Sequence, residues 1–486
     1  MRPLTTTAST DLPPRDTYDL VVIGAGAVGE NVADRAVQGG LSVLIVEGEL
    51  VGGECSYWAC MPSKALLRAG SVQRAAHAVA GARGPAGAGA VDARAVLARR
   101  DEIAAHWDDA GQVRWLQKAG IALARGHARL DGERRVVITA ADGGTRTVTA
   151  SHAVAVCTGS IAAMPPIPGL AAARPWTSRE ITSTESVPRR LAIIGGGVVG
   201  CEMATAFTSL GSRVTLLARS ALLADVEPFA GEAVAARLRE DGAEVLERTS
   251  PERVDRRDDG TVTLTLPGGR VIEADEIVVA TGRAPATDGL GLETVGLEPG
   301  SWLAVDDTMR VEGHPWLYAV GDVNHRALLT HQGKYQARAA GDVIVARARG
   351  ASVDDAAWGP HVATADHDAV PQVTFTSPEV ASVGLTAAAA AARGLRTRVV
   401  DYELGWLAAA TVHGEGYRGT ARMVVDEDER VIVGFTLVGD DVGELLHAAT
   451  IAVVGRVPLE RLWHAVPAYP TLSEVWLRLL EGYGRP

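Results

Sequence analysis

The pattern of apolar and polar positions predicts a strand, a helix and a second strand near the start of the chain. Residues 18–23 form an apolar run with the length of a buried strand, and the next segment opens with glycines and continues to Gln38 with helical character. A second apolar run covers 41–46 and ends at Glu47. This order of strand, glycine-rich turn, helix and strand is typical of a β-α-β unit.

The same plan recurs later in the chain as an internal repeat. Residues 191–194 predict a strand, a glycine-rich turn and a helix follow, and 213–217 predict a second strand that ends at Ala218. In both copies the strand-end residue lies 18 positions after the last glycine of the turn. Both copies also close with an apolar run into a Thr-Gly pair, at 158–159 and 281–282. The sequence therefore predicts two related domains.

Each turn carries the spacing Gly-x-Gly-x-x-Gly. The glycines of the two copies are Gly24, Gly26 and Gly29, and Gly195, Gly197 and Gly200. Glycines at this spacing let the backbone approach a pyrophosphate, which rests on the N-terminus of the following helix. Because each motif lies between a predicted strand and a predicted helix, the sequence predicts two dinucleotide-binding sites.

Composition and charge narrow the class of protein. The chain has 486 residues, 47% of them hydrophobic, and a net charge of −12, which argues against nucleic acid or an anionic membrane as a main partner. The apolar run 191–210 is long enough to span a membrane, but it contains the second glycine motif and Glu202, so we do not interpret it as a membrane helix. With four cysteines and no apolar export signal in residues 1–16, the sequence favours a cytoplasmic location, with 1–16 as a disordered tail.

Two cysteines, Cys55 and Cys60, follow directly on the first β-α-β unit in the segment Gly-Gly-Glu-Cys-Ser-Tyr-Trp-Ala-Cys-Met-Pro-Ser-Lys. In a reducing compartment a close cysteine pair is more often catalytic or metal-binding than structural. The motif ends at Lys64, and lysine occurs elsewhere only at Lys118 and Lys334, so this lysine is a candidate for a chemical role.

Between the copies we expect a loop of small residues at 81–90 and a helical stretch around 101–118, and from about Val370 alternating strands and helices indicate a separate α+β domain.

Together with Gly321-Asp322 and the segment 376–384, the two glycine motifs and the Cys-x4-Cys motif resemble the pyridine nucleotide-disulfide oxidoreductases, a family that includes glutathione reductase, dihydrolipoamide dehydrogenase and mercuric reductase.

The resemblance implies an α/β fold with two Rossmann-like domains, the second inserted in the first, and a C-terminal α+β dimerisation domain. The implied boundaries are 17–160 and 287–358 for the FAD domain, 161–286 for the NAD(P)H domain and 365–486 for the dimerisation domain. A homodimer that reduces a small-molecule electron acceptor is expected.

The resemblance also implies the residues that hold the two cofactors. FAD is expected at Gly24, Gly26, Gly29, Glu47, Gly53, Lys64, Thr158, Gly159, Asp322 and His331. NADPH is expected at Gly195, Gly197, Gly200, Glu202, Arg219 and Gly282. Glu47 would bind the ribose hydroxyls and Asp322 the ribityl chain. His331 falls where the family starts a helix that points at the flavin, and the histidine has either a role there or only caps and packs.

For the chemistry, the resemblance implies that Cys60 is the charge-transfer thiol against the flavin and that Cys55 is the interchange thiol that faces substrate. Lys64 would lie near flavin N5, paired with Glu202. A cation at this place favours reduced flavin and lowers the pKa of the neighbouring thiol. Cys157 and Cys201 fall in predicted core positions and are interpreted as small buried residues.

Two departures from the family pattern refine the expected function. Ala218 stands where an acid would select NAD, and Arg219 follows it, which favours NADPH. At the C-terminus Tyr469 stands where most of the family has a histidine, while Glu474 keeps the glutamate position. Tyrosine titrates about three pH units above histidine and is a poor proton shuttle near neutral pH. Mercuric reductase shares this tyrosine but has C-terminal vicinal cysteines, which this chain lacks.

The sequence thus predicts an NADPH-dependent flavoprotein reductase that passes electrons through FAD to Cys55 and Cys60. Its acceptor would be a metal ion, a quinone-type electrophile or an unusual disulfide. The alternatives are a disulfide reductase or lipoamide dehydrogenase with an altered proton shuttle and, in a different class, a non-catalytic flavoprotein subunit of a multienzyme assembly.

Overall fold

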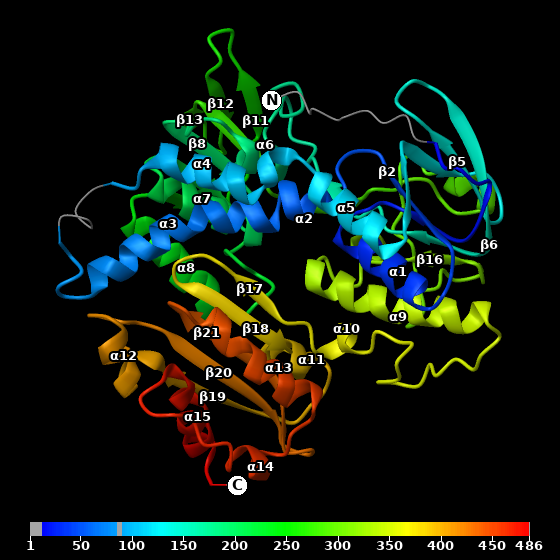
Figure 1. Cartoon of the computed structure of the whole chain (residues 1–486). Coiled ribbons are helices and arrows are strands. Elements are labelled where there is room, and N and C mark those ends of the chain that lie inside the picture. The colour runs from blue at the N-terminus through cyan, green and yellow to red at the C-terminus, as the bar shows by residue number, and fades with distance from the viewer. Residues whose placement is uncertain (1–11, 85–89, 486) are drawn as a thin grey trace. The chain divides into compact units, whose positions relative to one another are not determined.

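The computed structural model describes residues 12–84 and 90–485 (Figure 1). The chain divides into two compact units. The first contains the residues up to 62, 101–162 and 283–366. The second contains 63–100, 163–282 and the residues from 367 onward.

The first unit is built on a seven-stranded sheet with the order β3-β2-β1-β6-β5-β4, in which β16 also pairs with β6. Its strands are β1 (Thr17–Ile23), β2 (Val43–Glu47), β3 (Ala122–Arg125), β4 (His127–Leu130), β5 (Arg135–Thr139), β6 (Thr145–Val156) and β16 (Leu317–Ala319), with a separate ladder of β7 (Ser160–Ala162) and β15 (Arg283–Pro285). Its helices are α1 (Ala27–Gln38), α2 (Gly53–Tyr57), the start of α3 (Cys60–Ala78), α5 (Ala110–Ala119), α9 (Thr330–Ala348) and the start of α10 (Ala365–Asp368).

Strands β3, β2, β1, β6 and β16 run parallel, and both faces of this part of the sheet are covered. Leu20 and Val22 of β1 pack with α1 and α9, whereas Val21 and Ile23 pack on the opposite face. This explains the nearly continuous apolar run of β1, because a parallel strand that is buried on both faces has no polar side. Helices α1 and α9 lie side by side along one face (Figure 1).

The second unit contains a four-stranded parallel sheet with the order β10-β9-β8-β14 and a three-stranded antiparallel sheet. The strands are β8 (Arg190–Ile194), β9 (Arg213–Leu217), β10 (Glu244–Leu246), β11 (Arg253–Arg256), β12 (Val262–Thr265), β13 (Val271–Ala274) and β14 (Glu276–Val279). The helices are the remainder of α3, α4 (Ala93–Ile103), α6 (Ser178–Ser183), α7 (Val198–Ser209) and α8 (Pro228–Glu240).

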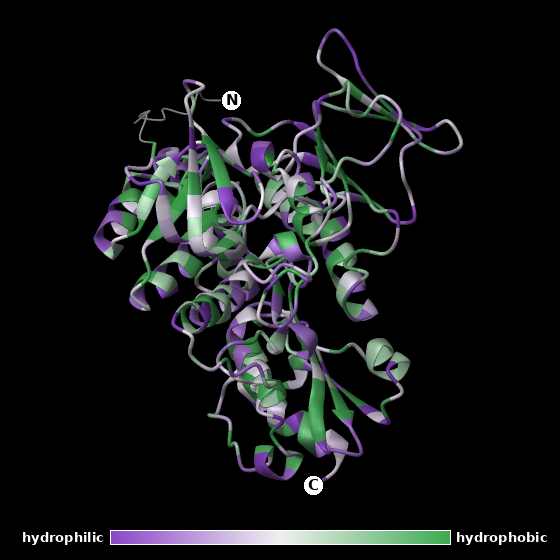
Figure 2. Ribbon diagram, turned by 90° about the vertical axis from the view of Figure 1, so that its right-hand side faces the viewer, coloured by the Kyte–Doolittle hydropathy of each residue, from purple (hydrophilic) through white to green (hydrophobic). Residues whose placement is uncertain are grey.

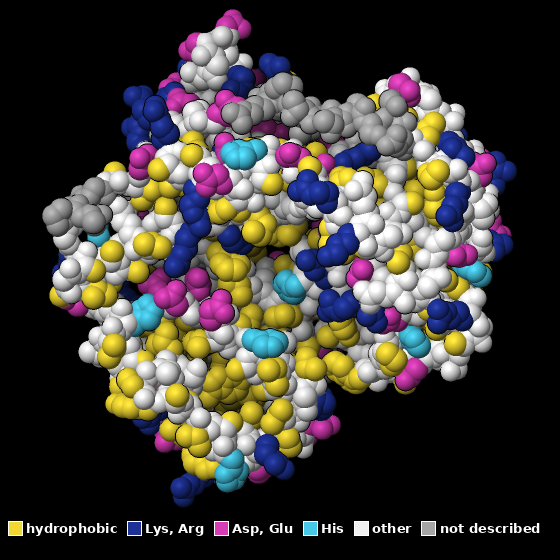
Figure 3. Space-filling model, viewed as in Figure 1, with side chains coloured by type: hydrophobic (Ala, Val, Ile, Leu, Met, Phe, Trp, Pro, Cys, Tyr) yellow, Lys and Arg dark blue, Asp and Glu magenta, His cyan; other side chains and the backbone are white. Residues whose placement is uncertain are grey.

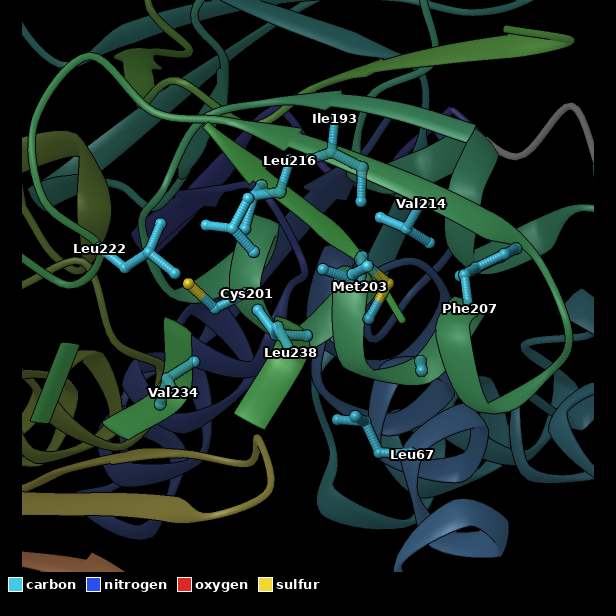
Figure 4. Close-up of a cluster of buried hydrophobic side chains, with 14 of the residues drawn as sticks. Leu67, Ile193, Cys201, Met203, Phe207, Val214, Leu216, Leu222, Val234 and Leu238 are labelled. Carbon is cyan, nitrogen blue, oxygen red and sulfur yellow. The ribbon is translucent and has the colours of Figure 1, made fainter. Parts of the chain in front are cut away.

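A hydrophobic cluster joins this parallel sheet to its helices (Figure 4). Ile193 and Leu216 of the sheet meet Phe207 of α7 and Leu238 of α8, and Leu67 of α3 belongs to the same cluster. The apolar segment 191–210 is therefore a strand, a turn and a helix inside a core. Among the described residues no helix combines the length and apolar character that crossing a bilayer requires.

The C-terminal part of the second unit is a five-stranded antiparallel sheet with the order β17-β18-β21-β20-β19. Its strands carry hydrophobic stretches that are interrupted by polar residues (Figure 2). They are β17 (Gln372–Thr374), β18 (Glu379–Gly384), β19 (Thr397–Glu403), β20 (Thr420–Asp426) and β21 (Val431–Gly439), with helices α11 (Ala387–Ala392), α12 (Ala408–His413), α13 (Leu446–Val454), α14 (Leu459–Leu462) and α15 (Val475–Tyr483). The α+β domain expected from about Val370 is present.

The structure confirms both β-α-β units and corrects one helix. The predicted helical stretch 101–118 is interrupted, because α4 ends at Ile103 and α5 begins at Ala110, with positive φ at His106 between them. In the predicted tail 1–16, Leu12 packs against the first core and Asp16 pairs with Arg146, while residues 1–11 lie outside the described residues. Residues 85–89 of the predicted loop also lie outside them.

The close approach of strand and helix in each β-α-β unit predicts which glycines the fold requires. A Cβ atom on Gly200 would lie 1.8 Å from the carbonyl oxygen of Gly195, whereas a Cβ on Gly197 would meet nothing within 4 Å. We expect Gly200→Ala to destabilise the protein by at least about 1–3 kcal/mol, the usual cost of overpacking. Gly197→Ala should change stability by less than about 0.5 kcal/mol. Thermal unfolding followed by circular dichroism compares the two, and equal midpoints would refute the argument.

Candidate active site

The carboxyl ends of four neighbouring parallel strands form one edge in the first unit. Glu47 is the last residue of β2, and Gly24, Thr158 and Asp322 follow the last residues of β1, β6 and β16 by one, two and three positions. This is the edge at which open parallel sheets bind nucleotides. Residues that are up to 298 positions apart in the chain thus contribute to one edge.

The glycines at this edge allow a close backbone approach. Gly24 has φ +99°, and a Cβ there would lie 2.5 Å from the carbonyl oxygen of Cys157. A Cβ on Gly29 would lie 1.9 Å from the carbonyl oxygen of Gly24. Gly53 has φ +62°, and its Cβ would lie 2.8 Å from the Cα of Gly26, so the start of α2 rests against the glycine turn. Among the described residues no side chain caps the N-terminus of α1 by a hydrogen bond at Gly26, so the free N–H groups there suit a phosphate.

Glu47 is fixed at the end of β2 by backbone donors. Its carboxylate accepts hydrogen bonds from Ala25 N at 2.7 Å and Glu49 N at 2.8 Å. Burial raises the pKa of Glu47, and these two hydrogen bonds oppose the shift. A carboxylate in this place fits the ribose hydroxyls of an adenine dinucleotide.

Polar groups at the ends of β6 and β16 also fit a bound cofactor. The Oγ1 of Thr158 is buried and has no hydrogen-bond partner among the described residues, and Gly159 follows it with φ +74°. The Ser160 hydroxyl donates to Asp322 Oδ2 at 2.5 Å and accepts from Arg283 Nε at 2.9 Å. The residues at this edge therefore suit FAD: the glycine turn fits its phosphates, Glu47 its ribose and Asp322 its ribityl chain.

Cys55 and Cys60 lie on two consecutive helices, α2 and α3, close to the start of α9. Cys55 is on α2, Cys60 begins α3, and both side chains are half-buried. The two thiols are hydrogen-bonded to each other, and Cys60 Sγ lies 3.4 Å from Thr330 Oγ1. The predicted helix start is found at Thr330, and the next residue, His331, is exposed.

The two thiols titrate as an interacting pair. The hydrogen bond with Cys60 and burial raise the pKa of Cys55, and the charge of Cys60 adds to the effect, whereas Thr330 and Lys334 act in the opposite direction. Because the two groups interact strongly, loss of the first proton is a property of the pair.

In the second unit, Lys64 is held by a carboxylate and an aromatic ring. Its Nζ lies 2.8 Å from Glu202 Oε2 and 3.2 Å from Oε1, and Glu202 is buried. The ammonium group lies 4.8 Å from the ring centroid of Phe375, whose backbone N–H donates to Glu202 Oε1 at 3.0 Å. The buried carboxylate is satisfied by these contacts, so Lys64 is oriented and charged.

The parallel sheet of the second unit repeats the nucleotide edge. Gly195 has φ +127°, and α7 begins directly after Gly197. Arg219 is exposed just beyond the end of β9, after the buried Ala218. Gly282 lies three residues after the end of β14 (Glu276–Val279) and has φ +142°, and a Cβ at this position would meet nothing within 4 Å.

A second arginine, Arg248, lies near Arg219. It follows β10, which pairs with β9, and the backbone N–H of Thr249 donates to the carbonyl oxygen of Ala218 at 2.8 Å. Two cations at the carboxyl ends of neighbouring strands suit a 2′-phosphate better than one. The sequence argument missed Arg248 because nothing in its local pattern marks it.

At the C-terminus, Tyr469 and Glu474 differ in exposure. Tyr469 is 74% exposed, whereas Glu474 is 6% exposed. Arg478 donates to Glu474 Oε1 at 2.5 Å, and Oε2 is buried without a hydrogen-bond partner among the described residues.

Cys157 and Cys201 are buried as predicted, and burial raises the pKa of both thiols. Within 12–84 and 90–485 no cluster of three or more His, Cys, Asp or Glu side chains could hold a metal ion.

Comparison with known proteins matches almost the whole chain to a single family. Residues 18–343 match the model of the pyridine nucleotide-disulphide oxidoreductases, and 370–479 match the dimerisation domain of that family. The mercuric reductase of Acidithiobacillus ferrooxidans is 34% identical over 94% of this chain and 80% of its own length.

Further relatives include both a mercuric reductase and a glutathione reductase. The mercuric reductase of Streptomyces lividans is 33% identical and the glutathione reductase of Burkholderia cepacia 30% identical, with at least 94% of each chain covered. The Cu(II) complex of the HOCl-induced flavoprotein disulfide reductase RclA from Escherichia coli has the same fold, with a TM-score of 0.81 at 22% identity over 96% of this chain and 99% of RclA. On these matches and on its two nucleotide edges and cysteine pair, the chain belongs to the pyridine nucleotide-disulphide oxidoreductases, flavoprotein enzymes that use FAD and NAD(P)H.

Proposed function

We propose that this enzyme takes electrons from NADPH and delivers them, through FAD and the Cys55–Cys60 pair, to a thiophilic acceptor such as a soft metal ion. The observation that carries the proposal is the pair of free, half-buried thiols at the start of α9, where Cys60 Sγ lies 3.4 Å from Thr330 Oγ1. A pair of this kind offers one thiol to the acceptor and one thiolate to the cofactor. Bound FAD would supply transfer of two electrons between nucleotide and thiols.

The residues of the chain then have distinct roles. Glu47, Thr158 and Asp322 hold FAD, and His331 lies at the start of the helix that faces it. Lys64 contributes a fixed positive charge, because Glu202 and Phe375 restrain its ammonium group. The lysine lies four residues after Cys60 on α3, which is about one helical turn.

NADPH is the proposed donor because β9 of the second unit is followed by Ala218 and Arg219 and not by an acid. Ala218 cannot repel a 2′-phosphate, and Arg219 and Arg248 lie at the ends of adjacent strands. Arginine pairs well with phosphate through its planar fork of donors.

The chemical class of the acceptor is inferred from Tyr469. The phenol of this residue can hold a soft cation or an electrophile near a thiolate, but it is a weak proton donor near neutral pH. The mercuric reductase relatives support a metal acceptor, and the name of the RclA complex supports copper as a second candidate ion. A quinone-type electrophile and an unusual disulfide have the same requirement for a thiolate, and the glutathione reductase relative favours the disulfide.

We also propose a homodimer, since the dimerisation domain leaves apolar side chains exposed. Figure 3 shows hydrophobic side chains gathered over the C-terminal part of the chain around α13. Ile451 of α13, Val466 and Tyr469 are each more than half exposed. A second copy that covers this surface would bring its Tyr469 toward the acceptor site of the first.

Cys60→Ser tests which thiol interacts with the flavin. The purified enzyme should be yellow and, on reduction by dithionite or NADPH, should show long-wavelength charge-transfer absorption. Cys60→Ser should abolish this band while FAD remains bound, because the thiolate donor is lost. Cys55→Ser is the matched control and should keep the band. A band that survives in Cys60→Ser would assign the donor to another group.

Arg219→Ala tests the choice of nucleotide. The apparent KM for NADPH should rise about 10- to 100-fold, as expected for loss of a charged hydrogen bond of about 1.5–3 kcal/mol. The KM for NADH should remain nearly unchanged, because NADH has no 2′-phosphate. Arg213→Ala is the control, since Arg213 is an exposed arginine at the opposite end of β9. An equal rise with both nucleotides would show that Arg219 does not bind the phosphate.

Tyr469→His tests the proton argument. The wild type should turn over glutathione disulfide or lipoamide slowly, and Tyr469→His should raise that rate about 10-fold or more, because the imidazole can deliver a proton to the leaving thiolate. Glu474 Oε2, buried and without a partner in the described part of the chain, is available to orient the new imidazole. Steady-state assays from about pH 6 to 9 with a disulfide and with a metal ion measure the effect.

Tyr469→Phe is the control for this experiment. It removes the phenol without adding a proton donor, so it should lower metal-ion turnover and leave disulfide turnover low. A wild type that already reduces a common disulfide at a high rate would refute the role of Tyr469 and favour the disulfide reductase alternative.

A further inference from the structure

A buried carboxylate in the first unit has no role in the mechanism above. Asp366 lies in α10, and 1% of its side chain is exposed. Each of its carboxylate oxygens accepts a hydrogen bond from a glutamine of α9. Oδ1 accepts from Gln332 Nε2 at 2.8 Å, and Oδ2 accepts from Gln336 Nε2 at 2.8 Å. The two glutamines are four residues apart and therefore share one face of the helix.

A cation balances the charge of this acid. Arg326 Nε lies 3.5 Å from Asp366 Oδ2, and the same guanidinium binds Asp307 at 2.6 Å. A buried ion pair contributes little to the free energy of folding, because the cost of removing two charges from water offsets their attraction. A buried acid with this set of donors is better suited to fix the arrangement of its neighbours than to stabilise the fold.

The amide of Gln336 connects Asp366 to the turn that carries Asp322. Gln336 is fully buried, and its Oε1 accepts from Gly321 N at 2.8 Å and from Asn324 Nδ2 at 2.8 Å. Its Nε2 is the group that donates to Asp366. Because both ends of the amide are engaged, the side chain is held in one orientation, with its acceptor end toward the turn.

The turn is also held at its own polar side chains. Ser160 donates to Asp322 Oδ2 at 2.5 Å, so the other carboxylate oxygen can accept from a ribityl hydroxyl. Asn324, which ends the short helix Asp322–Asn324, donates to Ala319 O at 3.0 Å. The chain itself thus sets the position of the Asp322 carboxylate, and such preorganisation lowers the cost of binding a ligand.

The same acid fixes the first turn of α9. Gln332 is the third residue of this helix, and the first residue, Thr330, lies 3.4 Å from Cys60 Sγ. One carboxylate therefore connects the turn at Asp322 with the helix start beside the redox cysteines. These are the two places where the proposed function puts the ribityl chain and the flavin ring.

We propose that Asp366 is a positioning residue for the flavin half of FAD. It acts on Asp322 through Gln336 and on the start of α9 through Gln332. The adenosine half of the site is built from other elements, β1, β2 and α1. This inference deepens the proposed function and rests on its placement of FAD at Asp322. Loss of the Asp366 contacts should therefore weaken binding of FAD and leave binding of ADP unchanged.

The test compares FAD and ADP on the full chain after FAD has been removed. ADP carries the adenosine and the two phosphates of FAD without the ribityl chain and the flavin, so it reports the adenosine half alone. Isothermal titration gives both dissociation constants. Asp366→Asn should raise that of FAD about 10- to 100-fold, as for loss of a hydrogen bond to a charged group, and that of ADP by less than about twofold.

A reversed pair provides the rescue. In Asp366→Asn the new amide donor faces the donor of Gln336, and adding Gln336→Glu turns this clash into a hydrogen bond. The new carboxylate can still accept from Gly321 N and Asn324 Nδ2, so the double variant should bind FAD within about threefold of the wild type. Asp368→Asn is the matched control, because Asp368 is an exposed acid of the same helix, and it should change neither constant.

Equal losses of FAD and ADP affinity in Asp366→Asn would overturn the proposal, since they would show general damage to the first unit. Unchanged FAD binding would overturn it too. If this variant does not fold, the double variant decides, and FAD binding more than about 10-fold weaker than in the wild type overturns the proposal.

Asp322→Ala separates this inference from the proposed function. If Asp322→Ala binds FAD as tightly as the wild type, the proposed FAD site is wrong and the inference falls with it. If Asp322→Ala weakens FAD binding and Asp366→Asn does not, the FAD site stands and the positioning role of Asp366 is refuted.

Discussion

The structure depends on one steric constraint that occurs twice, the contact of a helix N-terminus with the end of the preceding strand. Gly29 approaches Gly24 and Gly200 approaches Gly195 so closely that any Cβ would lie within 2 Å of a carbonyl oxygen. This contact directs the first turns of α1 and α7 toward the carboxyl ends of their sheets. Only with the helix in this position can its free N–H groups face a phosphate. The cofactor residues of each unit are arranged around that point.

Much of this arrangement could be predicted because its signals are local. The glycine spacing, the flanking apolar runs and the Cys-x4-Cys motif lie within short segments, and the structure contains the expected strands and helices around them. Glu47 and Ala218 could be compared because Glu47 is the last residue of the second strand of its copy and Ala218 directly follows the second strand of the other. The replacement at Tyr469 was visible only because the family resemblance assigned a histidine to that position. The broken helix between Ile103 and Ala110 was not predicted, since its break depends on backbone conformations that no glycine or proline marks.

The contacts that no local pattern could show join residues far apart in the chain. Arg283 reaches Ser160, and Ser160 reaches Asp322, across more than 100 positions in each case. The backbone N–H of Phe375 donates to Glu202, and its ring faces the ammonium group of Lys64. No sequence pattern around Phe375 predicts either contact. These contacts orient the groups that local motifs supply. The first contact follows from the antiparallel pairing of β7 with β15, and the second forms where the residue after β17 packs against α3 and α7.

Arginine and lysine have different uses in this chain. Arginine stabilises the fold through ion pairs, whereas two of the lysines place a positive charge near chemically reactive groups. Arginine forms the structural ion pairs, such as Arg35 with Asp342, where a planar fork fits a carboxylate. Of the three lysines, Lys64 pairs with a buried glutamate in the second unit, and Lys334 acts on Glu30 and Cys55 in the first. The ammonium group of Lys64 contacts both oxygens of the Glu202 carboxylate and faces the ring of Phe375, so three segments of the second unit together fix the position of one positive charge.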